Sequence, residues 1–87
     1  MANKCVKIFL DKDADREFED IIVEANGQMY YSTIGVLRDN ADVVIKLFAN
    51  NQMLPHQEAL KDRGKCIAVY SYDTETEKAI LCSGNIN

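Results

Sequence analysis

The stretch that decides the fold is residues 18–36, FEDIIVEANGQMYYSTIGV. At its centre, Asn26-Gly27 is a residue pair that tolerates the positive φ angles of a two-residue hairpin turn. The pair predicts an antiparallel hairpin with the arms Phe18–Ala25 and Gln28–Val36. In this register one face carries Ile21, Val23, Tyr30, Ile34 and Val36, and the other carries Asp20, Ile22, Met29, Tyr31 and Thr33.

A helix over residues 14–25 is the competing interpretation. Apolar residues recur there with helical spacing, acids occupy the first turn, and Gly27 would follow the last turn. The residues with this spacing are Ala14, Phe18, Ile21, Ile22 and Ala25. We favour the hairpin because Ile21-Ile22-Val23 is β-branched throughout, and because the run YYSTI at 30–34 needs an antiparallel neighbour.

Outside this stretch, alternating apolar residues predict a first strand over Lys4–Leu10. A helix capped by Asp39 or Asn40 is expected to run to about Asn50, since its apolar residues form one stripe. After Pro55, residues 56–61 are expected to add one short helical turn.

The C-terminal part predicts a second hairpin. Lys65–Asp73 alternates in the manner of a strand, and Lys78–Ser83 returns after a polar turn. Thr74 and Glu77 have the spacing of a capping box, so a terminal helix over 75–83 remains the alternative. The expected fold class is α+β, a two-layer arrangement in which an antiparallel sheet of β-β-β-α-β-β order carries one main helix on one face.

Length and composition indicate one ordinary globular domain over residues 1–87. The chain is 47% hydrophobic and 28% charged, which is typical of a folded protein with a single core. Fourteen acidic against ten basic residues leave a net charge of −4. This charge disfavours direct binding to nucleic acid and favours a protein partner with a basic surface. No apolar run reaches the roughly 20 residues of a membrane helix, so no membrane association is expected.

Cysteine and histidine usage suggests no cofactor or metal. Cys5, Cys66 and Cys82 are odd in number and far apart, without a C-x-x-C pair. We expect them to be small buried residues of a cytoplasmic protein in a reducing compartment. His56 is the single histidine, so a nucleophilic pair with a cysteine is the least favoured hypothesis and no catalytic residue is assigned.

Alternating acids are the most distinctive feature of residues 11–24. The run begins like a calcium loop, but Arg16 stands where that loop needs glycine and Ile22 where it needs glutamate. An extended backbone would project alternate carboxylates to one side at about 6.5 to 7 Å, close to the phosphate spacing of a nucleic-acid strand. The same acids would also serve as a solvated face that keeps an edge strand from pairing. The predicted partner-binding residues are Asp11, Asp13, Asp15, Glu17, Glu19, Asp20 and Glu24.

Two functional hypotheses follow from these features. The first is a small acidic inhibitor that occupies a basic nucleic-acid-handling protein, a general character shared by phage and mobile-element inhibitors, including anti-CRISPR proteins. The second is a structural or regulatory homodimer joined through tyrosine-bearing strands, because tyrosine is favoured at interfaces. The possible interface residues are Tyr30, Tyr31, Tyr70 and Tyr72, which would otherwise border the core with their hydroxyls in water.

Overall fold

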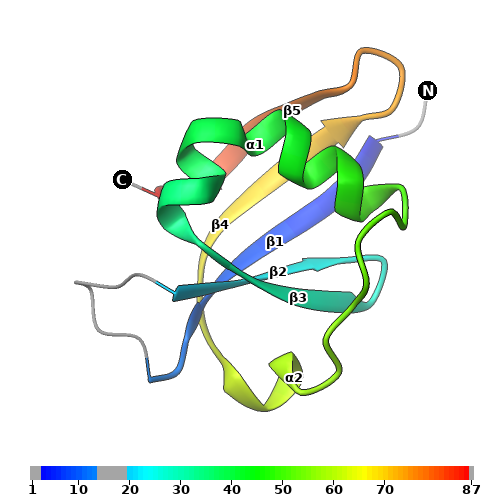
Figure 1. Cartoon of the computed structure of the whole chain (residues 1–87). Coiled ribbons are helices and arrows are strands. Elements are labelled where there is room, and N and C mark those ends of the chain that lie inside the picture. Colours follow the sequence, from blue (N-terminus) through cyan, green and yellow to red (C-terminus); the bar gives the residue numbers. More distant parts are fainter. Residues whose placement is uncertain (1–2, 14–19, 87) are drawn as a thin grey trace.

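Five antiparallel strands and one main helix make up the protein in the computed structural model, which describes residues 3–13 and 20–86. The sheet has the strand order β3-β2-β1-β4-β5, and α1 lies across one of its faces (Figure 1). This is the two-layer α+β fold and the β-β-β-α-β-β element order that the sequence predicts. The elements are β1 (Asn3–Asp11), β2 (Asp20–Ala25), β3 (Gln28–Thr33), α1 (Ile34–Ala49), α2 (Ala59–Asp62), β4 (Arg63–Asp73) and β5 (Lys78–Gly84).

The Asn26-Gly27 hairpin is confirmed. Asn26 and Gly27 have φ angles of 56° and 76°, the left-handed conformation that the turn requires. Val23 lies opposite Tyr30 in the ladder between β2 and β3, which is the predicted register. Residues 20–25 are therefore strand, so the helical alternative is wrong for this part of the chain, whereas residues 14–19 lie outside the described residues.

The second arm of the hairpin is shorter than predicted. β3 ends at Thr33, whose hydroxyl accepts a hydrogen bond from the N–H of Val36 at 3.3 Å and caps α1. Ile34 and Val36 consequently belong to the helix rather than to a face of the hairpin. The helix therefore starts before the predicted cap, but its backbone leaves helical geometry at Asn40, with φ −141° and ψ 42°.

The main core lies between α1 and the sheet. Leu37, Ile45 and Phe48 of α1 are buried against the apolar face of the strands. The ring of Tyr30 packs on Phe48 with 4.4 Å between centroids. Burial raises the pKa of Tyr30 to about 12, and its buried hydroxyl has no hydrogen-bond partner among the described residues.

The C-terminal hairpin is also confirmed. Lys78 pairs with Asp73 and Ala79 with Tyr72, so the terminal helix over 75–83 is wrong. The short turn expected at 56–61 is found slightly later in the chain, as α2.

All three cysteines are exposed, so the expectation of buried cysteines is wrong. For Cys5 the reason is the pleat of the strand: Val6 is buried under α1, and its neighbour therefore points to the other face of the sheet.

Two β-bulges account for the other two cysteines. Ile8 pairs with Ala68, but Phe9 pairs with Cys66, which leaves Ile67 as an extra residue and moves Cys66 off the core face. The second bulge lies in β5. Leu81 pairs with Tyr70 and Ser83 pairs with Val69, so Cys82 between them has no partner residue in β4. Strict alternation along the sequence does not show either bulge.

Candidate protein-binding surface

A second, smaller apolar cluster lies on the face of the sheet away from α1. Phe9, Ile22 and Tyr31 are cross-strand neighbours on β1, β2 and β3. Ile22 is fully buried there, as is Ala59 of α2, although neither belongs to the main core. The guanidinium of Arg63 lies 4.9 Å from the centre of the Phe9 ring, a cation–π contact. One end of this face is therefore covered by the chain itself.

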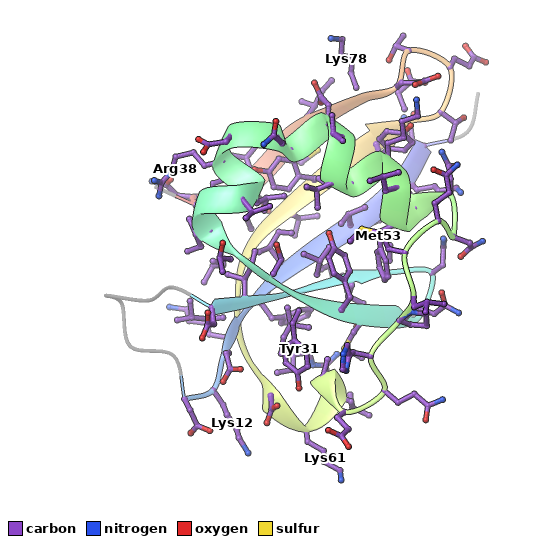
Figure 2. All side chains as sticks on the ribbon, in the orientation of Figure 1. Lys12, Tyr31, Arg38, Met53, Lys61 and Lys78 are labelled. Carbon is purple, nitrogen blue, oxygen red and sulfur yellow. The ribbon has the colours of Figure 1, made fainter. Side chains whose placement is uncertain are left out.

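Residues 50–62, here called the covering segment, run from the end of α1 past the β3 edge to α2 (Figure 1). The N–H of His56 donates to the carbonyl oxygen of Met29 on β3 at 2.6 Å. The ring of His56 meets Tyr31 edge-on, with 5.0 Å between centroids. The Tyr31 hydroxyl donates to a carboxylate oxygen of Asp62 at 2.5 Å, and Figure 2 shows Tyr31 between β3 and α2. These contacts cover the β3 edge at Met29 and Tyr31.

Asp11 and Asp20 line a hollow of about 340 Å³ together with Tyr31, Ser32 and Thr33. Asp11 ends β1 and Asp20 begins β2, so the antiparallel pairing brings them to the same end of the sheet. Within residues 3–13 and 20–86, no basic side chain lies within ion-pair distance of Asp11 or Asp20. We call the group Asp11, Asp13, Asp20 and Asp62 the acidic end.

The protonation of Tyr31 reflects this negative surrounding. The hydrogen bond to Asp62, together with burial and the charges of Asp62, Glu58 and Asp11, raises the pKa of Tyr31 to about 12. Tyr31 therefore stays neutral at physiological pH and contributes a hydroxyl and a ring rather than a charge. The negative charge of the acidic end comes from its carboxylates alone.

The backbone between Asp11 and Asp13 is not extended. It turns at Lys12 and Asp13, and the N–H of Asp13 donates to the Asp11 carboxylate at 2.9 Å. The predicted row of carboxylates at phosphate spacing is thus wrong for this pair. Asp15, Glu17 and Glu19, the other members of that row, lie outside the described residues.

Glu24 has a basic partner among the described residues and Asp20 does not, although both lie on the same face of β2. Its carboxylate pairs with Arg63 at 3.0 Å, which neutralises it. Asp62 is a member of the acidic end that sequence reasoning missed. Asp62 contacts Tyr31 because α2 packs beside β3. The two residues are 31 positions apart in sequence, so no local pattern predicts their contact. Lys12 is 3.8 Å from Asp62 and offsets part of its charge.

Three of the four tyrosines proposed as an interface belong to the protein's own core. Tyr30, Tyr70 and Tyr72 are buried in the main core, and Tyr31 alone is partly exposed. Burial raises the pKa of Tyr70 as well. A homodimer joined through these strands would thus have little tyrosine surface to present.

Two other kinds of site are absent from the described residues. Within residues 3–13 and 20–86, no three His, Cys, Asp or Glu side chains gather in a way that could hold a metal ion. None of the helices in these ranges is long and apolar enough to cross a membrane. Comparison of the chain with protein-family models, curated proteins and solved structures found no match.

Proposed function

We propose that this protein is a small acidic binding module that inhibits a nucleic-acid-handling protein by occupying its basic surface. The observation that supports it is the convergence of Asp11 and Asp20, two carboxylates from different strands that have no basic neighbour among the described residues. Carboxylates that form no ion pair with the described residues attract a basic surface without first having to break such a pair. The net charge of −4 adds long-range attraction.

The site is presented by the ends of paired strands. Asp11 and Asp20 are held at the ends of paired strands, and Tyr31 is fixed by Asp62 and His56. A preorganised surface loses less conformational freedom on binding than a flexible acidic tail does. The three free, exposed thiols favour a reducing cytoplasm as the place of action.

The test uses immobilised protein to recover a partner from a lysate of the native host. The variant Asp11→Asn/Asp20→Asn removes both charges while keeping side-chain size and the acceptor for the N–H of Asp13. Its charge-matched control is Asp39→Asn/Glu75→Gln, with one change in α1 and one in the turn between β4 and β5. Wild type and control are expected to retain a basic protein that a DNA or RNA oligonucleotide displaces.

The acidic-end variant is expected to bind that protein at least about tenfold more weakly at low salt, because two charge contacts are lost. The difference should shrink as salt is raised, since salt screens exposed charges. Equal retention by the acidic-end variant, or a retained protein that no oligonucleotide displaces, would contradict the proposal.

A further inference from the structure

The β5 edge of the sheet is open, and it lies on the other side of the molecule from the β3 edge (Figure 1). On the outer side of this strand, Asp42 of α1 accepts a hydrogen bond from the N–H of Ala79 at 2.7 Å and lies 4.0 Å from the ammonium of Lys78. Because strand groups alternate with a period of two, the N–H and C=O of Leu81 point to the same outer side as those of Ala79. These groups are free to pair with another strand.

The side chains of β5 are unusually apolar for an open edge. Ile80 is 61% exposed and Leu81 is 43% exposed, and they lie on opposite faces because they pair with Ser71 and Tyr70. Edge strands are commonly protected by charged residues along their length. In β5 the sole charged residue is Lys78, at its first position.

We propose that β5 pairs in antiparallel fashion with β5 of a second copy of this chain, around a two-fold axis at Leu81. With this register Leu81 faces Leu81, Ile80 faces Cys82, and Lys78 faces Gly84. The two lysines therefore lie at opposite ends of the new ladder and do not repel each other. The result is one continuous sheet shared by the two copies, joined by the self-complementary contact that a two-fold axis requires.

The helix beside β5 supports the same occupant. α1 is tied to this hairpin by the bond from Ala79 to Asp42 and by the ion pair between Lys46 and Glu77. A two-fold axis normal to the sheet places both α1 helices on one face and runs them antiparallel. Asp42 pairs with Lys78 of its own copy at 4.0 Å and Lys46 pairs with Glu77, so these charges beside β5 are neutralised within each copy. Because the two Lys78 residues lie at opposite ends of the ladder, pairing of two copies creates no like-charge contact, which favours a second copy over a strand of arbitrary charge.

The expected dimer is weak to moderate in affinity. A seven-residue strand alone buries less than the about 1,200 Å² that stable interfaces need, so the flank of α1 must contribute. The α1 residues known to face β5 are Asp42 and Lys46, so this flank contributes mainly polar surface. A dissociation constant of about micromolar order is expected.

The test is sedimentation equilibrium of the full chain over micromolar to millimolar concentrations. Ile80→Lys adds a charge to each copy at the new ladder and is expected to raise the dimer dissociation constant at least about tenfold. Leu54→Lys is the matched control, because Leu54 is 89% exposed and lies in the covering segment, away from β5. Equal thermal unfolding of the two variants at dilution would show that both fold.

A cross-link tests the register. With Cys5, Cys66 and Cys82 replaced by Ser, Leu81→Cys is expected to form a disulfide-linked dimer, because residues directly opposite have Cα atoms about 5.5 Å apart. Ile80→Cys in the same background is the control and should stay unlinked, since residue 80 faces residue 82.

Three results would overturn the proposal: a wild type that stays monomeric at every concentration, an Ile80→Lys variant that dimerises as the wild type does, or failure of Leu81→Cys to cross-link. The acidic-end variant Asp11→Asn/Asp20→Asn is expected to dimerise normally. Failure of the inhibitor proposal and failure of the dimer proposal are therefore distinguishable.

Discussion

The two edge strands of the sheet differ in how the rest of the chain covers their outward-facing N–H and C=O groups. At the β3 edge the covering segment bonds to the strand through His56 and Met29, and Tyr31 is held by Asp62. At the β5 edge Asp42 takes one N–H, and the strand beyond it is exposed. One chain thus closes one edge with its own residues and leaves the other for a second molecule.

This difference separates two modes of recognition. The covering segment already occupies the β3 edge at Met29 and Tyr31, so we expect a partner near β3 to be recognised through side chains, with the carboxylates of Asp11 and Asp20 providing the charge. An open edge offers main-chain hydrogen bonds, which recognise a strand with little regard to its sequence. Substitutions at either edge test the contacts that create this contrast.

The largest effect on the free energy of unfolding is expected from a substitution at Gly84, the last residue of β5. Its φ is +81°, and a Cβ there would lie 2.0 Å from the carbonyl oxygen of Ile67, a backbone atom of β4. Gly84→Ala should therefore lower the free energy of unfolding by about 3 kcal/mol, from strained φ and overpacking combined. Urea denaturation measures this, and a loss below about 1 kcal/mol would show that β5 is not docked in this way.

Gly35→Ala is the matched control for Gly84→Ala. Gly35 lies in the first turn of α1, and a Cβ there meets nothing within 4 Å. Alanine should raise the free energy of unfolding by about 0.5 to 1 kcal/mol, because it restricts the unfolded chain.

The next effect is expected at Asp42, which covers the first part of the β5 edge. Asp42→Ala removes the acceptor of the Ala79 N–H and should lower the free energy of unfolding by about 1 kcal/mol, the typical value of such a bond. Asp39→Ala, on the same helix, should change it by less than about 0.5 kcal/mol. Thermal unfolding of dilute protein checks both, and equal values for the two would mean that Asp42 does not protect this edge.

A smaller effect is expected on the covered edge, from a pair of tyrosines that are adjacent in sequence. Tyr31→Phe removes the hydroxyl that donates to Asp62 and should lower stability. Tyr30→Phe removes a buried hydroxyl that has no partner among the described residues, so it should leave stability unchanged or raise it. The order of the two variants in a urea titration is the measurement, and the reverse order would contradict the assigned contacts.

The last expected effect is a loss of stability that is absent at neutral pH and appears at alkaline pH. The pKa values of Tyr30 and Tyr31 are raised from 10.0 to about 12, by burial and by the bond to Asp62 respectively. Between these pH values the native state holds protons that the unfolded state releases, so stability falls as pH rises from 10 toward 12. Urea titrations across this range should show a smaller fall for Tyr31→Phe, whereas a flat profile for the wild type would contradict both shifts.

Most of the fold was predictable from local patterns. The Asn26-Gly27 turn and the alternation of the strands predict all five strands and the fold class, because turn chemistry and strand period are local properties. The end of β3 was misplaced because Thr33 suits both a strand and a helix cap, and the pattern of alternation continues past it. The bulges that turn Cys66 and Cys82 outward depend on the partner strand, so no single stretch of sequence reveals them.

The candidate site was less predictable than the fold. Asp11 and Asp20 were among the predicted residues. Whether a given carboxylate forms an ion pair or a hydrogen bond, however, depends on residues distant in sequence. Arg63 neutralises Glu24, and Asp62 binds Tyr31, through tertiary packing of α2 and the start of β4. Charge along the chain predicts an acidic surface, whereas only the fold determines which carboxylates remain unpaired.

Amide hydrogen exchange followed by NMR, at low and at high protein concentration, tests the contrast between the two edges most directly. The His56 amide, bonded to Met29, is expected to be protected equally at both concentrations. The Leu81 amide is expected to exchange rapidly in dilute protein and to become protected as concentration rises. Rapid exchange of His56, or a Leu81 amide whose exchange does not depend on concentration, would contradict a closed β3 edge and an open, self-pairing β5 edge.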